Sequence, residues 1–423
     1  MSLLRDRRFA LLAFGQAVNA IGSWCALVAL WGFASFRFDA GPSELALLGL
    51  AWALPAVLLG PIAGIPVDRF GPKRVIVVAD SIAAAVALLF LLADSFSALI
   101  LLGAVEGITK AFSEPAFQAL PPRIVPDDRL AAANGVLSTA TMSSLALGPL
   151  LAAVSIASFG VEGAFVVNAA TYLVGVVVLL PFRIGPAPVP AGTETQGVVA
   201  EIREGLRVVR ARPELRRLFV LAGSVYLIWG AFVVVEPIYV REVLHGTPTL
   251  FAMLQSTFGI GLVVTGIVVA RLGDRLVRWS VVCIAAIGSA AGAALYVGTA
   301  TVAVAFVGLF LWGVVTALLI SPMRTLMQRA APVETHGRVF AFDGMVHSTA
   351  DLVSLPVVGL AAGLVGVQVA GVGMAVLPLA GGLLTWRNVR RSRTAAPVVP
   401  AEVATAPPVA ETEPVVVPEP AVA

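Results

Sequence analysis

Ionisable side chains interrupt several long apolar stretches of this chain, where a charge is costly. Glu106 and Lys110 lie four residues apart in one stretch, so on a helix they would share a face and could form an ion pair. Glu236 lies in another such stretch, and the amides of Gln16 and Asn19 lie in the first one. Charge inside an apolar medium usually marks a pathway for protons, ions or a polar ligand, so these residues are candidates for proton coupling and substrate binding. The alternatives are a purely structural pair for Glu106 and Lys110, and a hydrated acid near the membrane surface for Glu236.

A second polar group recurs with helical spacing near the C-terminal end. Asp343, His347 and Asp351 repeat every four residues and would form one polar stripe on a helix. For Asp343 we expect a gate contact with the arginines Arg69 or Arg74 rather than contact with a substrate. His347 could equally be a packing residue.

Patterns typical of enzymes are absent from the sequence. It contains no metal-ligand spacing, no phosphate-binding glycine loop and no nucleophile elbow, and its two cysteines, Cys25 and Cys283, lie in apolar stretches. We therefore expect no enzyme activity, no metal and no cofactor, and an ATP-driven pump is disfavoured.

The elements that position these residues are membrane helices. The chain has 423 residues, of which 59% are hydrophobic and 13% charged, and its mean hydropathy is +0.95. Each apolar stretch of about 20 residues can cross a bilayer as a helix. We place them near 9–36, 45–66, 75–93, 97–120, 134–159, 163–182, 218–240, 249–270, 279–298, 302–322, 340–364 and 368–386. The sequence therefore predicts an all-α membrane protein with about twelve transmembrane helices.

The arginines set the expected orientation. With the N-terminus in the cytoplasm and alternating sides, only Arg37 and Arg241 fall outside. This asymmetry follows the positive-inside rule and predicts cytoplasmic N- and C-termini in a bacterial plasma or inner membrane. The net charge of +3 therefore gives no reason to expect a nucleic acid partner.

The spans divide into two halves of six. We expect an N-terminal half over 1–182, a cytoplasmic linker over 183–217, a C-terminal half over 218–390 and a disordered tail over 391–423. Within the linker, Val199, Ile202, Leu206 and Val209 share one helical face and Arg203, Arg207 and Arg210 the other, which predicts an amphipathic helix at the inner membrane surface. The segment GIPVDRFGPK at 64–73 is repeated as GIVVARLGDR at 266–275. Parallel repeats of this kind are typical of secondary transporters.

The first copy of this repeat resembles the signature loop of the major facilitator superfamily. The matching residues are Gly64, Asp68, Arg69, Gly71, Lys73 and Arg74. The resemblance implies a cytoplasmic gate in which Asp68 caps a helix and binds arginines in one state and releases them in another. Ala270 replaces the aspartate in the second copy, so that gate is incomplete.

Two further segments resemble parts of this superfamily. Gly135, Ser144, Gly148, Pro149 and Ala152 follow the spacing of the antiporter motif of the fifth helix, for which general small-residue packing is the alternative. The segment from Ala111 to Asn134 is similar to the branch that holds macrolide-efflux proteins and the enterobactin exporter. Gly103 stands at about the position of the arginine that this family has in its fourth helix. Lys110 is a candidate to provide the missing positive charge.

The resemblance implies a secondary transporter that exports an amphipathic small molecule, such as a drug, macrolide or siderophore, by proton antiport with alternating access. Glu106 is the first candidate for the proton carrier and Glu236 the second. The expected partners are the substrate, protons and the lipid bilayer, and we expect a monomer. Alternatives are an uptake symporter or lysolipid flippase of the same fold, or a membrane sensor or scaffold that does not transport.

Overall fold

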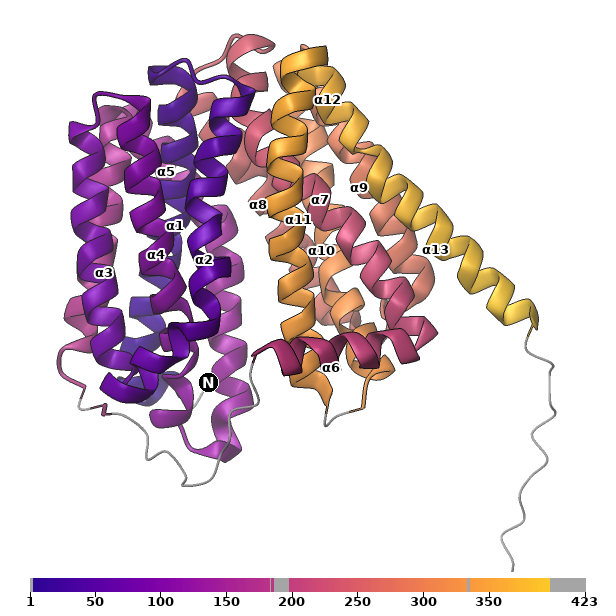
Figure 1. Cartoon of the computed structure of the whole chain (residues 1–423), viewed down its shortest axis with the longest axis horizontal. Coiled ribbons are helices and arrows are strands. Elements are labelled where there is room, and N and C mark those ends of the chain that lie inside the picture. The colour runs from indigo at the N-terminus through magenta and orange to yellow at the C-terminus, as the bar shows by residue number, and fades with distance from the viewer. Residues whose placement is uncertain (1–2, 183, 186–197, 333–334, 396–423) are drawn as a thin grey trace, which may run out of the picture.

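The computed structural model describes residues 3–182, 184–185, 198–332 and 335–395, which fold as helices without a strand. The N-terminal half contains α1 (Arg7–Arg37), α2 (Pro42–Phe70), α3 (Pro72–Leu89), α4 (Phe96–Gln118) and α5 (Asp127–Leu179). The C-terminal half contains α7 (Pro213–Glu242), α8 (Pro248–Leu272), α9 (Trp279–Val297), α10 (Val302–Ala330), α11 (His336–Val365), α12 (Val367–Met374) and α13 (Val376–Ala395). The two halves stand side by side in Figure 1.

Twelve membrane crossings follow from these helices. Within the described residues, eleven helical segments are long and apolar enough to cross a membrane. One of them is α5, whose 53 residues would reach about 80 Å if straight, more than two bilayer cores. At Gly160 the backbone turns to φ 77°, ψ 179°, so α5 holds two crossings. This confirms the predicted all-α fold with about twelve spans.

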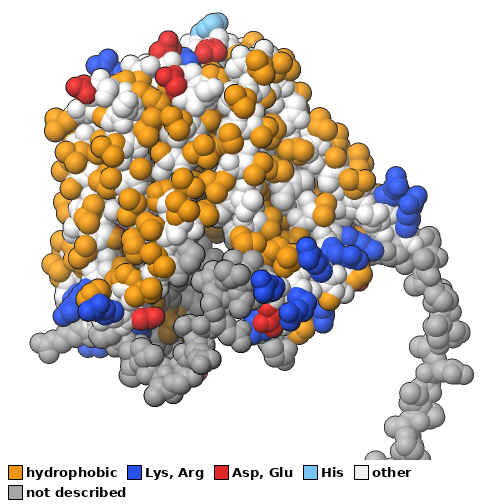
Figure 2. Space-filling view, viewed as in Figure 1, with side chains coloured by type: hydrophobic (Ala, Val, Ile, Leu, Met, Phe, Trp, Pro, Cys, Tyr) orange, Lys and Arg blue, Asp and Glu red, His pale blue; other side chains and the backbone are white. Residues whose placement is uncertain are grey.

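Apolar and charged side chains separate along the molecule. Figure 2 shows hydrophobic side chains over the flanks, with Lys and Arg gathered at the end that carries α6 and α13. We call this the inner end, and the end that carries the turn between α1 and α2 the outer end. The cytoplasmic location of the inner end remains the prediction made from the arginines.

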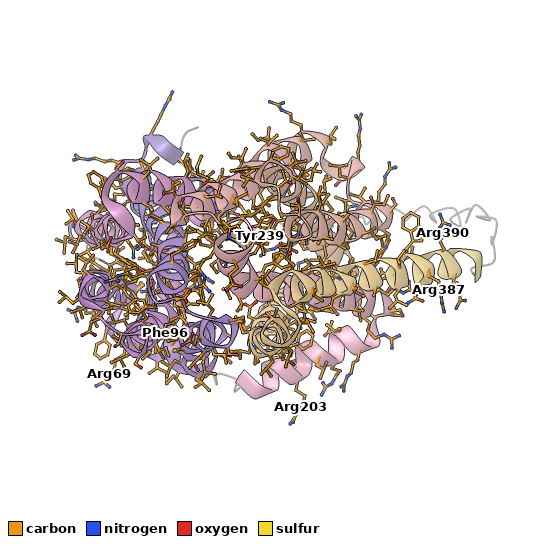
Figure 3. The ribbon with its side chains drawn as sticks, turned by 90° about the horizontal axis from the view of Figure 1, so that it is seen from above. Arg69, Phe96, Arg203, Tyr239, Arg387 and Arg390 are labelled. Atoms are coloured by element: carbon orange, nitrogen blue, oxygen red, sulfur yellow. The ribbon has the colours of Figure 1, made fainter. Side chains whose placement is uncertain are left out.

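The linker helix α6 (Val198–Ala211) packs on the C-terminal half at the inner end. Val209 is buried, whereas Arg203, Arg207 and Arg210 are exposed, and Figure 3 shows Arg203 pointing away from the bundle. The Glu204 carboxylate binds the Arg338 guanidinium of α11 at 2.5 Å. The apolar side of the predicted amphipathic helix thus packs on the bundle, and the ion pair of Glu204 ties α6 to α11, the helix that carries the polar stripe.

The predicted linker and tail each overlap a helix of the structure. Helix α7 begins at Pro213, within the predicted linker of 183–217, and residues 183 and 186–197 of that linker lie outside the described residues. Helix α13 extends to Ala395, and the predicted tail beyond it, 396–423, also lies outside them.

Helices α1 and α5 approach closely at Gly148. A Cβ atom at Gly148 would lie 2.3 Å from the Cβ of Trp24 and 2.8 Å from the carbonyl oxygen of Ile21, closer than atoms can pack. The hydrogen side chain of Gly148 therefore sets the spacing of these helices. Gly135, on the same helix, has no atom within 4 Å of the corresponding position.

The two halves meet at the outer end and separate toward the inner end. A Cβ at Gly359 of α11 would lie 2.7 Å from the Cβ of Ala46 on α2, and one at Gly49 of α2 would lie 2.8 Å from Leu355. Farther inward on the same pair of helices, a Cβ at Gly64 would meet no atom within 4 Å. The structure therefore shows a conformation in which the two halves are packed together at the outer end.

Arg241, at the end of α7, provides polar contacts between the halves at the outer end. Its guanidinium lies 3.0 Å from the Asp39 carboxylate and donates hydrogen bonds to the carbonyl oxygens of Ser35 and Ala40. The Arg241 side chain is 16% exposed, so these bonds are shielded from water more than those of a surface pair. Arg241 is one of the two basic residues predicted to lie outside, and this contact explains its position.

We expect Arg241→Ala to open the outer end. Each lost hydrogen bond to a charged group is worth about 1.5–3 kcal/mol, and about 1.4 kcal/mol shifts an equilibrium tenfold. Spin labels at the exposed outer positions Asp94 and Ala300 should then give a longer-distance population by pulsed electron resonance. The exposed Arg37 is the control, and Arg37→Ala should leave the distances unchanged. Unchanged distances in Arg241→Ala would mean that apolar packing alone closes this end.

We expect Gly148→Ala to lower the apparent unfolding temperature in detergent, because overpacking typically costs about 1–3 kcal/mol. Gly135→Ala is the matched control on the same helix. It should be neutral or stabilising by up to about 1 kcal/mol, because alanine favours helix and the site is open. Equal unfolding temperatures for the two variants would contradict the close approach of α1 and α5.

Candidate functional site

A cavity of about 340 Å³ lies among four helices of the N-terminal half. Its lining combines amides, hydroxyls, aromatic rings and one residue of each charge. The lining residues are Gln16, Asn19, Ala20, Ser23, Trp24 and Leu27 of α1, Trp52 of α2, Lys110, Ser113, Glu114 and Phe117 of α4, and Thr141 and Tyr172 of α5. Three residues predicted from the sequence, Gln16, Asn19 and Lys110, therefore line this cavity.

A polar network connects the cavity to a buried acid of α3. The Asn19 amide donates to the Asp80 carboxylate at 2.8 Å, and the Ser23 hydroxyl donates to the Asn19 carbonyl oxygen at 3.4 Å. Asp80 is only 1% exposed. The predicted amide of α1 thus both faces the cavity and satisfies a carboxyl group behind it.

The predicted ion pair between Glu106 and Lys110 is absent from this conformation. No ion pair within 4.0 Å joins these two described residues; instead the Lys110 Nζ lies 4.8 Å from the centroid of the Trp52 ring. Glu106 is 5% exposed, and its Oε1 accepts a hydrogen bond of 3.5 Å from the Tyr172 hydroxyl. Helical spacing brings the two side chains to one face of α4, but the Lys110 ammonium lies over the Trp52 ring of the neighbouring helix α2 instead of beside Glu106.

The aromatic residues of the cavity were missed in the sequence. Trp52 has no motif around it, and aromatic residues on membrane helices usually pack against other helices or lipid. Gly107 gives the only local signal: a Cβ there would lie 2.2 Å from the Trp52 carbonyl oxygen. This close approach of α2 and α4 places the Trp52 ring beside Lys110.

Glu236 lies apart from this cavity. It is 5% exposed in α7 of the C-terminal half, and its carboxylate accepts a hydrogen bond of 2.6 Å from the Gln255 amide of α8. The structure thus does not bring the two candidate acids, Glu106 and Glu236, into one site.

The polar stripe of α11 contacts aromatic residues of α7. The His347 ring stacks on the Tyr226 ring with centroids 4.4 Å apart, and its Nε2 lies 3.8 Å from the Asp351 carboxylate. The Tyr226 hydroxyl donates to the Asp343 carboxylate at 3.1 Å. Since Asp343 binds within its own half, the predicted contact with Arg69 or Arg74 is absent here.

The signature loop is free of the opposite half. Gly71 adopts φ 83°, a left-handed conformation that glycine allows, and joins α2 directly to Pro72 at the start of α3. Asp68, Arg69 and Arg74 are exposed, and Figure 3 shows Arg69 pointing outward. Lys73 binds within the N-terminal half, and its ammonium donates to the carbonyl oxygens of Leu180 and Phe182 at 2.6 and 2.5 Å. The Lys73 ammonium therefore caps the backbone carbonyl groups at the C-terminal end of the sixth span.

The small residues of the fifth helix divide into two groups. Ser144, Gly148, Pro149 and Ala152 are buried, whereas Gly135 is exposed near the inner end. Only the buried group packs closely in this conformation. Among the described residues, no group of three or more His, Cys, Asp or Glu side chains could hold a metal ion.

Comparisons with known proteins agree with this architecture. The sequence model of the Major Facilitator Superfamily matches residues 12–354 and 218–417. The uncharacterized MFS-type transporter YfiS of Bacillus subtilis (strain 168) is 26% identical over 373 residues, which cover 86% of this chain and 88% of the relative. Macrolide efflux protein A of Streptococcus pyogenes is 23% identical, with 63% of this chain and 67% of the relative covered.

Further similarity extends beyond drug efflux. The lysophospholipid transporter LplT of Serratia proteamaculans (strain 568) is 26% identical, with 74% of this chain and 79% of the relative covered. A solved bacterial homolog of the human lysosomal transporter Spinster superimposes with a TM-score of 0.72 at 15% identity, over 92% of this chain and 98% of that chain. The matched residues, the twelve crossings and the two-half architecture lead to one conclusion: this multi-pass membrane protein belongs to the major facilitator superfamily.

Proposed function

We propose that this protein exports an amphipathic small molecule from the cytoplasm in exchange for protons. The observation that carries the proposal is the cavity of the N-terminal half, which is lined by Lys110 and Trp52 and backed by two buried acids, Glu106 and Asp80, in a chain closed at its outer end. Aromatic rings with a few polar groups suit a ligand that is partly apolar and partly polar. The cavity lies toward the inner ends of α1 and α4, which is where an exporter would take up its substrate.

Alternating access would exchange two sets of contacts. In the present conformation Arg241 and the packed ends of α2 and α11 close the outer end. The exposed Asp68 and Arg69 would form their gate contacts when the inner end closes. Each set stabilises one state, so a substrate or proton that favours one of them shifts the balance.

Glu106 is the proposed proton carrier. Its carboxyl group is buried and lies beyond ion-pair distance of Lys110. The protonated form is favoured because an unpaired charge at this depth costs on the order of several kcal/mol. Glu236 is the second candidate, because it too is buried and has a neutral partner in Gln255.

The test is uptake into inverted membrane vesicles, where export appears as accumulation. Dyes, macrolides and lysophospholipids would be supplied with and without a pH gradient. Accumulation driven by the gradient supports the exporter. Loss of preloaded substrate, driven by the same gradient with the vesicle interior acidic, indicates an uptake symporter. Movement of lysophospholipid between leaflets indicates a flippase, and no movement of any compound a sensor or scaffold.

We expect Glu106→Gln to lose accumulation driven by the pH gradient, down to the level seen without a gradient. Glutamine mimics the protonated acid, so substrate exchange without net proton movement should persist. Glu162→Gln, an exposed acid of α5, is the control and should accumulate normally. Full accumulation by Glu106→Gln would transfer the proton role to another acid, with Glu236→Gln as the next variant.

We expect Asp68→Asn to reduce turnover roughly tenfold at normal abundance, since losing one charge-assisted hydrogen bond of the inner gate costs about 1.5–3 kcal/mol. Abundance should not change because the Asp68 side chain is exposed. The exposed Asp94 at the outer end provides the control, Asp94→Asn. Turnover equal to that of the unmodified protein would exclude the gate role of Asp68.

A further inference from the structure

The contact between Lys110 and Trp52 is a cation site that is already occupied. A Lys110 ammonium 4.8 Å from the Trp52 centroid lies within the distance at which an aromatic face attracts a cation, and tryptophan attracts most strongly. The backbone of Trp52 is held against α4, because α2 and α4 touch at Gly107. The residue that carries the ring therefore lies beside the helix that carries Lys110.

Lys110 has other positions within reach. Glu106 lies four residues before it and Glu114 four residues after it on α4, so both carboxyl groups share its face. A glutamate four residues N-terminal to a lysine is the favourable order for a helical ion pair. Neither carboxylate is within 4.0 Å in the present conformation. The lysine thus has a ring on one side and a buried acid on the other.

The charges around the cavity favour a cation as the guest. Glu114 of α4 lines the cavity, whereas Asp80 of α3 and Glu106 of α4 are buried behind it and bind the lining residues Asn19 and Tyr172. The other polar groups of the lining are neutral: the amides of α1, the hydroxyls of Ser23, Ser113 and Thr141, and the Tyr172 phenol. Among the described residues that line the cavity, Lys110 is the one basic residue. An anion would meet the Glu114 carboxyl group in the lining and two more buried behind it for one ammonium, whereas a cation would meet these acids and the rings of Trp24, Trp52 and Phe117.

We propose that Lys110 occupies the place of the substrate, that the substrate is an organic cation whose charged group binds on Trp52, and that its binding moves the Lys110 ammonium to Glu106. The proton balance is complete. Before binding, Lys110 is an ammonium on the ring and Glu106 is a neutral acid. After binding, the Glu106 carboxylate pairs with Lys110, and its proton has passed to water at the inner side. A monovalent cation thus replaces one proton, which is the exchange an antiporter needs.

This inference rests on the proposed export function, but it can be tested by binding alone. The probes are tetraphenylphosphonium and tetraphenylborate, which have nearly the same shape and opposite charge. Binding to the purified full-length protein in detergent is measured by calorimetry, and released protons by a pH indicator in weak buffer.

We expect tetraphenylphosphonium to bind at least tenfold more tightly than tetraphenylborate and to release protons in proportion to occupancy. Lys110→Met removes the internal competitor, so binding should tighten roughly threefold to tenfold while proton release disappears. Trp52→Leu should weaken binding roughly fivefold or more. Lys110→Arg retains the charge and should retain proton release, which separates the role of the charge from a folding defect.

The control is a second ring–cation contact of the same kind outside the cavity. Arg390 lies 4.8 Å from the centroid of the Trp386 ring on α13, and Trp386→Leu should leave binding and proton release unchanged. Preferential binding of tetraphenylborate, or weaker binding of tetraphenylphosphonium to Lys110→Met, would overturn the inference. Cation binding without proton release would overturn its coupling step. In each case the vesicle experiment still decides the export function independently.

Discussion

The arrangement of this protein depends on closure of its outer end, where Arg241 of one half binds the turn between α1 and α2 of the other. A guanidinium that is mostly buried needs several acceptors, and the Asp39 carboxylate with two backbone carbonyl oxygens provides them. Because the halves meet there, they separate toward α6 and the signature loop remains exposed, and the cavity of the N-terminal half lies toward the inner ends of α1 and α4. The outer contact and the inner gate are therefore alternatives, and a cycle would exchange one for the other.

The cavity shows how few charged groups a membrane protein needs to couple two ligands. Glu106 and Asp80 are buried, yet each has a neutral hydrogen-bond partner, Tyr172 and Asn19. Lys110 is the mobile element among them, because its long side chain reaches both an aromatic ring and a carboxyl group. A permanent ion pair between Glu106 and Lys110 would not change when a substrate binds, whereas a lysine with two alternative positions would.

The C-terminal half contributes a different kind of site. His347 lies beside the rings of Tyr226 and Trp229 and 3.8 Å from the Asp351 carboxylate, and Asp343 binds the Tyr226 hydroxyl. Helix α6 holds the start of this same helix through Glu204 and Arg338. The polar stripe is therefore tied to the linker, which places it well to follow movement of α11 as the halves rock.

The sequence by itself determined the elements and their grouping. Apolar stretches of membrane length predicted twelve crossings, and a repeat predicted two halves. The crossings can be predicted because hydropathy and helical period depend on neighbouring residues. Helical spacing also placed Glu106 and Lys110 on one face, although it did not choose the partner of either.

Only the tertiary structure decided those partners. Lys110 lies over Trp52 rather than beside Glu106, Asp343 binds Tyr226 rather than an arginine of the gate, and Arg241 reaches Asp39. Each of these contacts joins residues far apart in the chain. Their formation depends on the rotation and spacing of whole helices, which close packing at positions such as Gly107 sets. A sequence pattern fixes which face of a helix a charge occupies, but the neighbour that meets this face is chosen by packing.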